Sequence, residues 1–164
     1  MAYNDAMASN ELEGAYRLAF DEAVRALQEQ GKVLDGLRTR SGIVLSAAAI
    51  VTSFLGGQAL TAHSPSIWTW LAIGAFVGLA LGLLVILWPR QDWAFEAVPR
   101  QIIGTYIEAS DPLPLPQIHR DLAIHMEDSY VENEGRMKPL FRSFRVSSLL
   151  LMAEISAWIV DLAR

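Results

Sequence analysis

The stretch SGIVLSAAAIVTSFLGGQAL (41–60), TAHSPS (61–66) and IWTWLAIGAFVGLALGLLVILWP (67–89) decides the fold of this chain. It contains no Asp, Glu, Lys or Arg. The polar, proline-containing segment 61–66 divides it into two apolar runs. Each run has about the 20 residues that an α-helix needs to cross a hydrocarbon core ~30 Å thick. The sequence therefore predicts a transmembrane hairpin over residues 41–89.

The residues that border this hairpin predict its orientation. Arg38 and Arg40 precede the first span, Arg90 follows the second, and the connecting turn, which includes His63, carries no Lys or Arg. Cytoplasmic loops carry an excess of Lys and Arg, so both ends of the hairpin are expected in the cytoplasm. Tryptophans, which concentrate at membrane interfaces, stand near both expected boundaries, at positions 68, 70, 88 and 93.

A third apolar run covers residues 143–164, after the cations Lys138 and Arg142. We expect it to be a third membrane helix that places the C-terminus outside the cytoplasm. Glu154 lies near its middle, where a charged residue costs about 2.5–3.5 kcal/mol on insertion scales. Three spans that share one interface could absorb this cost.

The remaining segments are expected to be cytoplasmic. Residues 1–9 are predicted to be disordered, and residues 10–40 to form an amphipathic helix with Asn10 as its N-cap. Its apolar stripe includes Phe20, Leu27 and Leu34 at heptad spacing. The stripe packs either on helices of the same chain or in a coiled coil between subunits.

Residues 90–142 are predicted to hold further cytoplasmic helices. A short interfacial helix is expected over Phe95–Ile107, and helix resumes near Gln117. Between them, Asp111-Pro-Leu-Pro-Leu-Pro116 reads as a rigid linker, because each proline disfavours helix at the preceding residue. The predicted fold class is thus all-α: an integral membrane protein with a hairpin, a third membrane helix and a cytoplasmic helical bundle.

Composition excludes several functional classes. The net charge of −5 argues against nucleic acid as a partner, because phosphate binding needs clustered Lys and Arg. With no cysteine, thiolate chemistry and Cys-ligated metals are excluded. The sequence has no phosphate-binding glycine loop, no zinc-protease motif and no nucleophile elbow. We therefore predict no catalytic residues, no metal site and no cofactor, and expect a protein that is not an enzyme.

Small residues line one face of each span of the hairpin. Residues four apart share a helical face and permit close helix approach in lipid. These residues are Gly74, Gly78 and Gly82 on the second span, and Gly42, Ser46, Ala49, Ser53 and Gly57 on the first. Either the two spans pack on each other through these faces, or one face serves the hairpin and the other builds a homo-oligomer.

Glu154 is the candidate functional residue of the membrane region. Carboxylates in membrane helices usually face the protein interior or water, and they often mark proton or ion paths. A ring of Glu154 from several subunits would suit cation passage. The alternative is a hydrogen bond to Ser147, to Ser53 or to a neighbouring subunit that only fixes helix packing.

Two segments carry a resemblance to known proteins: LDGLRTRSGIVLS (34–46) and SFLGG (53–57). Together with the order of helices, they resemble small bacterial membrane proteins of the SLATT and Pycsar-effector type. That resemblance implies a membrane effector in anti-phage defence that is driven by a nucleotide second messenger. It implies no ligand-binding residue at any position of this chain.

We therefore expect an oligomeric protein of the bacterial inner membrane, in contact with the lipid bilayer and with copies of itself. The leading hypothesis is a membrane-perturbing or channel-like effector in anti-phage or cell-death signalling. The alternative is a non-conducting scaffold or adaptor that recruits a partner through its cytoplasmic helices. The sequence identifies neither a protein partner nor a nucleotide signal.

Overall fold

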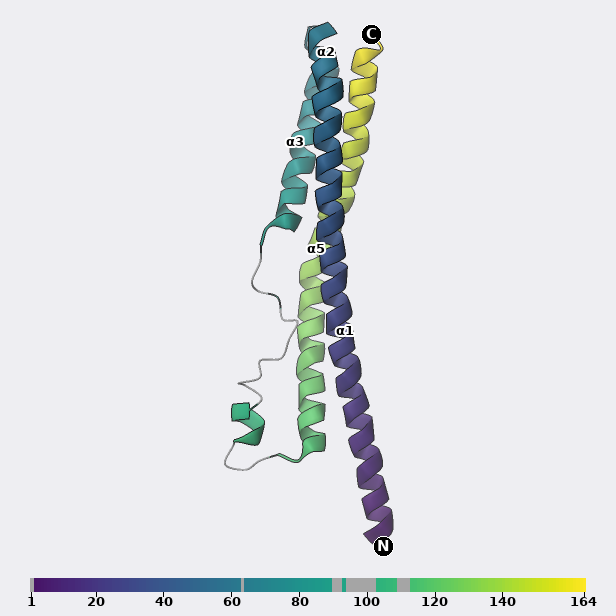
Figure 1. Cartoon of the computed structure of the whole chain (residues 1–164), viewed down its shortest axis with the longest axis vertical. Helices are drawn as coiled ribbons and strands as arrows, with labels where there is room; N and C mark the ends of the chain where they lie inside the picture. The colour runs from purple at the N-terminus through teal and green to yellow at the C-terminus, as the bar shows by residue number, and fades with distance from the viewer. Residues whose placement is uncertain (1, 63, 90–92, 94–102, 109–112) are drawn as a thin grey trace. The chain divides into compact units, whose positions relative to one another are not determined.

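The computed structural model describes residues 2–62, 64–89, 93, 103–108 and 113–164, and these residues form helices and their connections only. The elements are α1 (Ala2–Val51), the π-helical segment η1 (Thr52–Gly56), α2 (Gly57–Ala62), α3 (Ile67–Leu87), the π-helical segment η2 (Ile103–Ile107) and α5 (Leu115–Leu162) (Figure 1). The expected all-α class is confirmed. Three helical stretches are long and apolar enough to cross a membrane: Glu11–Thr61, Ile67–Leu87 and Leu115–Leu162.

The first helix starts earlier than the sequence predicted. α1 begins at Ala2, so the expectation of a disordered 1–9 and an N-cap at Asn10 differs from the structure. Residues 2–9 contain neither Gly nor Pro and include three alanines, so nothing in them stops the helix from extending towards the N-terminus. The helix also runs without interruption through residue 41, where the first predicted span begins.

The break between the two spans lies where the sequence predicted it. α2 ends at Ala62, and Ser64–Ser66 has no regular structure before α3 begins at Ile67. Ser66 is the N-cap: its Oγ accepts hydrogen bonds from the amides of Trp68 and Thr69, and Thr69 Oγ1 accepts one from the Ser66 amide. This capping box satisfies donors that the first turn of a helix leaves free. His63 lies outside the described residues.

The proline linker is shorter than predicted. Leu113 and Pro114 precede the helix, and α5 begins at Leu115, so Leu115 and Pro116 belong to its first turn. Proline is tolerated there because its missing N–H would have no helical partner. Of the predicted helix over Phe95–Ile107, the structure describes the segment η2; residues 95–102, like Arg90 and Asp111–Pro112, lie outside the described residues.

α1 and α5 each contribute to two compact units. We call residues 1–33 and 91–135 the polar unit, and residues 34–90 and 136–164 the apolar unit. In the polar unit, Leu27, Leu122 and Met126 are buried between the two helices. The Phe20 and His119 rings stack there with centroids 5.5 Å apart, and Gln30 Nε2 donates to the Tyr130 carbonyl oxygen at 3.0 Å.

The apolar unit brings three helical stretches together: the second half of α1 with η1 and α2, then α3, then the second half of α5 (Figure 1). Near one end of the unit, Ala59, Ala72, Ala157 and Trp158 form a buried cluster. Three of these four residues are alanines, so the helices approach closely around the indole of Trp158. Many other apolar side chains of this unit face outward, including Ile50 at 69% and Leu149 at 70% exposure.

Candidate functional site: buried polar groups of the apolar unit

Glu154 is fully buried, at 0% exposure, among the three helical stretches of the apolar unit. Its Oε1 accepts a hydrogen bond from Thr52 Oγ1. The sequence suggested Ser147 or Ser53 as partners, and neither is correct: Ser147 donates to the Leu79 carbonyl oxygen, and Ser53 faces outward. Because the carboxylate points into its own chain's bundle, a ring of Glu154 from several subunits is not formed by this arrangement.

Two buried polar atoms beside this contact are without a hydrogen-bond partner in the part of the chain that the structure describes. They are Oε2 of Glu154 and Nε1 of Trp158, one helical turn further along α5. One is an acceptor and the other a donor, which is the combination that a bound water or another small polar group bridges. The indole N–H of Trp158 thus lies close to the carboxylate of Glu154 as a second polar group.

The π-helical segment η1 positions the groups that face Glu154. It opens with Thr52, the hydrogen-bond donor, and closes with Gly56. A Cβ at Gly56 would lie 3.1 Å from two ring carbons of Trp158, so glycine is needed for this close approach. Single-turn π segments inside α-helices are frequent at functional sites. The sequence contains the pair Gly56-Gly57 but indicated Gly57, whose Cβ position is open.

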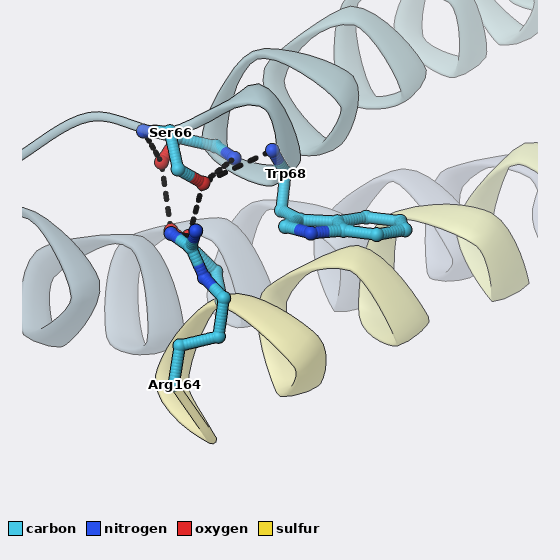
Figure 2. Close-up of polar contacts among 5 residues, drawn as sticks. Ser66, Trp68 and Arg164 are labelled. Atoms are coloured by element: carbon cyan, nitrogen blue, oxygen red, sulfur yellow. Dashed lines mark hydrogen bonds and ion pairs between the residues drawn. The ribbon is translucent and has the colours of Figure 1, made fainter.

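A second buried carboxylate, which the sequence analysis missed, joins the turn to the C-terminus. Asp161, 3% exposed, accepts hydrogen bonds from Ser66 Oγ and from Thr69 Oγ1, the latter at 2.7 Å. Arg164 Nη2 contacts the same carboxylate at 2.8 Å, and Figure 2 shows its side chain reaching back towards Ser66 while the Trp68 ring points away. The spacing Ser66-x-x-Thr69 could have identified the capping box, but not its partner 92 residues later.

The glycines of α3 approach α5, and they do so unequally. A Cβ at Gly82 would lie 2.4 Å from Ser147 Oγ, and one at Gly78 would lie 3.2 Å from Leu150 Cδ1. Ser143 Oγ also donates to the Gly82 carbonyl oxygen at 2.9 Å. Gly74 has open space at its Cβ position. This face therefore packs on the third predicted span, rather than on the first.

The small residues of the first span face outward. The Cβ positions of Gly42 and Gly57 are open, and Ser46, Ala49 and Ser53 are exposed. Ser46 Oγ donates to the carbonyl oxygen of Gly42 in its own helix. This outer face (Gly42, Ser46, Ala49, Ser53 and Gly57) is thus not used in packing within the chain.

The N-terminal stripe is used within the chain. Phe20 stacks on His119, and Leu27 and Leu34 are 2% and 1% exposed. This agrees with the first of the two alternatives, packing on helices of the same chain. Within the described ranges, no group of three or more His, Cys, Asp or Glu residues could hold a metal ion.

No protein-family model, curated protein or solved structure matches this chain.

Proposed function

We propose that this chain is an integral protein of the bacterial inner membrane that assembles into a homo-oligomer and acts as a channel-like or membrane-perturbing effector. The observation that carries the proposal is Glu154, a fully buried carboxylate with one oxygen bonded to Thr52 and the other unpartnered among the described residues. A carboxylate at this depth in an apolar bundle is costly, and such residues typically serve proton or ion movement. The weak resemblance noted above supports a role in anti-phage or cell-death signalling.

The dimensions of the apolar unit support membrane insertion. On α5, 19 residues separate Arg142 from Asp161, a rise of about 28 Å, close to the thickness of a hydrocarbon core. Between residues 146 and 160, Glu154 is the only charged residue. The outward-facing apolar side chains need lipid or another protein to cover them. We place the arginine-rich end and the N-terminus in the cytoplasm, and the C-terminus outside.

In this proposal, the Thr52–Glu154 hydrogen bond holds the closed state. The carboxylate must leave its own bundle, or the bundle must admit water, before Glu154 can act in a permeation path. Replacement of Thr52 by valine keeps the side-chain shape but removes the donor, so it favours opening. Replacement of Glu154 by glutamine keeps an acceptor for Thr52 and removes the negative charge.

Ion leakage from vesicles that carry the purified full chain tests this function. We expect Thr52→Val to raise leakage about tenfold over the wild type, and Glu154→Gln in the Thr52→Val background to reduce it again. Thr61→Val is the matched control for the lost hydroxyl, because Thr61 is exposed and its hydroxyl donates only to carbonyl oxygens of its own helix. If wild type and Thr52→Val are both as tight as protein-free vesicles, the effector function is wrong. Unchanged leakage in the double variant would remove Glu154 from the path.

The outer face of the first span is the proposed contact between subunits. Small residues there allow a helix of a second copy to approach closely. We expect Ala49→Phe to convert the oligomer to monomers, measured by light scattering in detergent, whereas the outward-facing neighbour variant Ile50→Phe keeps the oligomer mass. A monomeric wild type, or an unchanged mass for Ala49→Phe, would contradict this interface.

A groove in the polar unit favours the alternative function, a scaffold or adaptor. It has a volume of about 430 Å³ and is lined by four alanines, by Tyr16 and Tyr130, and by the charged residues Glu22, Glu127 and Arg120 among others. Its small, apolar lining and acidic residues suit the apolar face of a basic amphipathic helix from a partner protein. Glu127 forms no ion pair within the described residues, so it is available to a cation of that partner.

A synthetic amphipathic peptide of Leu and Lys provides the test of this alternative. Ala23→Phe, which fills the groove, is expected to weaken its binding to the full chain about tenfold, and Ala15→Phe, outside the groove lining, to leave binding unchanged. Equal peptide affinity for wild type and Ala23→Phe would exclude the groove as the docking site.

A further inference from the structure

We infer that four arginines at one end of the apolar unit, which we call the arginine collar (Arg38, Arg40, Arg142 and Arg145), bind the phosphate groups of anionic phospholipids. This inference depends on the membrane insertion proposed above, but not on permeation. It assigns a ligand class to the boundary of the bundle, namely anionic lipid headgroups of a single leaflet.

The helix register places the collar at one level. Within the apolar unit α1 and α5 run in the same direction, and the Thr52–Glu154 hydrogen bond joins positions 102 residues apart (Figure 1). Arg40 and Arg142 are also 102 positions apart, so the two residues lie at the same height along the bundle. Arg38 lies two residues before Arg40 and Arg145 lies three residues after Arg142, so the four arginines fall within about 8 Å along the bundle. The collar therefore lies on α1 and α5, about 14 to 21 Å from Glu154 along the helix axes.

The charges of the collar are available to a ligand. Arg40, Arg142 and Arg145 are exposed and form no ion pair or side-chain hydrogen bond among the described residues. The fourth cation, Arg38, has its Nη1 3.8 Å from Oδ1 of Asp35. Its Nε is buried and has no hydrogen-bond partner among the described residues. In contrast, Arg25 and Lys32 of the polar unit contact Glu22 and Glu29 at 2.6 Å.

The charge balance of the two units gives the collar its preference for anionic lipid. The apolar unit contains eight Arg and Lys against three Asp and Glu, a formal charge of +5, whereas the polar unit contains five against fifteen, a formal charge of −10. An anionic membrane surface repels the polar unit and attracts the collar. Guanidinium groups bind phosphate oxygens in a bidentate manner, which a lysine cannot reproduce.

The position of the collar also excludes most other anions. Residues 41–60 of α1 and α2 and residues 146–153 of α5, which follow the collar, are free of charged residues. A ligand at this boundary therefore meets apolar side chains on one side and guanidinium groups on the other. A phospholipid, with acyl chains beside a phosphate, matches both surfaces.

The test uses the delipidated full chain in detergent micelles doped with either phosphatidylglycerol or phosphatidylcholine, and measures lipid binding by native mass spectrometry. We expect the wild type to prefer phosphatidylglycerol, and Arg142→Gln with Arg145→Gln to reduce that preference on the order of 30-fold. The control is Arg25→Gln with Lys32→Gln, which changes the net charge equally but lies in the polar unit. It is expected to keep the full preference.

Three results would overturn the inference. The first is a wild type that binds phosphatidylglycerol and phosphatidylcholine equally. The second is a preference for phosphatidylglycerol that falls equally in the collar variant and in the control. The third is complete displacement of phosphatidylglycerol by 10-fold excess inorganic phosphate. The last result would assign the collar to a soluble phosphate compound. Flotation of each variant with neutral phosphatidylcholine vesicles tests membrane insertion separately from lipid binding by the collar. A collar variant that floats but no longer prefers phosphatidylglycerol supports the collar. A wild type that does not float contradicts both membrane insertion and the collar.

Discussion

The polar unit and the apolar unit are built largely from the same two helices and both bury mostly apolar side chains, yet they differ in what they expose and in the charges they bury. In the polar unit, the buried positions are mostly apolar, such as Leu27 and Leu122, and the charged residues lie outside. In the apolar unit, the outside carries Ile50 and Leu149, and the most buried residues include Glu154. The first arrangement is typical of a helix pair in water, and the second is what the proposed insertion in lipid requires.

This difference changes what stabilises each unit. Burial of apolar side chains drives packing in water, but it gives little advantage when lipid surrounds the helices. If the apolar unit is inserted as proposed, close helix approach at Gly82 and side-chain hydrogen bonds to Glu154 and Asp161 take over this role. Substitutions of small or polar buried residues should therefore have the largest effects in this unit.

Gly82→Leu is expected to have the largest effect. Its side chain would collide with Ser147 and Ser143, and overpacking of this kind costs about 3 kcal/mol. Gly78→Leu, which meets only Leu150, should cost less, and Gly74→Leu, which enters open space, should be neutral. Thermal unfolding in detergent measures all three. Equal unfolding temperatures for Gly82→Leu and Gly74→Leu would contradict the α3–α5 contact.

Asp161→Ala should have the next largest effect. It removes the acceptor for Ser66, Thr69 and Arg164 at once and leaves two hydroxyls without their partner, at a cost of about 2 kcal/mol. Arg164→Gln serves as the control, because it removes only the contact from a half-exposed arginine and leaves both hydroxyls bonded to Asp161, so it should cost less than about 1 kcal/mol. Limited proteolysis at the 61–66 turn measures this loss of stability. Identical cleavage rates for Asp161→Ala and the wild type would show that Asp161 does not hold the turn to the C-terminus.

Gln30→Ala tests the polar unit, where one buried hydrogen bond should matter less. The variant loses the bond from Nε2 to the Tyr130 carbonyl oxygen, worth about 1 kcal/mol. Its exposed neighbour Gln28 provides the matched variant Gln28→Ala, which should not change stability. Hydrogen exchange of the residues around Tyr130 would detect the difference, and no difference would show that Gln30 is not a packing residue.

The smallest effect is expected for the surface ion pairs of the polar unit. Glu29→Gln removes the contact with Lys32 at 2.6 Å, but both side chains are more than half exposed. Such pairs contribute about 0.5 kcal/mol or less, and salt screens them. A change in unfolding temperature comparable with that of Gln30→Ala would show that this unit depends on its surface charges more than we expect.

Several elements were predictable because they depend on local sequence. The proline-containing turn, the start of α3 near Ile67 and the end of the charge-free stretch at Pro89 follow from residues within a few positions. The predicted starts of α1 and α5 were wrong, because the hydrophobic pattern does not show how far a helix extends beyond its apolar stripe. Pro116 fits the first turn of α5, and the first nine residues contain no helix breaker, so both helices start earlier than predicted.

The partners of the buried groups could not be predicted from spacing. Gly74, Gly78 and Gly82 form one regular series, but only the last two approach α5. Thr52 and Ser53 are adjacent hydroxyls, and only the π-helical segment η1 determines which of them faces Glu154. Both cases depend on the rotation of one helix about its axis, which a single sequence does not encode locally.

The sequence by itself determined that the chain is helical, that residues 41–89 carry no charged side chain, and that one carboxylate falls near the middle of a third apolar run. Helix periodicity and hydropathy are properties of neighbouring residues, so they can be read without knowing the fold. Only the tertiary structure decided that Glu154 bonds to Thr52, that Asp161 joins the turn to the C-terminus, and that the first small-residue face stays on the outside. The two hydrogen-bonded contacts join residues about 90 to 100 positions apart, and the outer face is the part of a helix that its neighbours leave uncovered. Both depend on how the whole bundle packs, which neighbouring residues in the sequence do not determine.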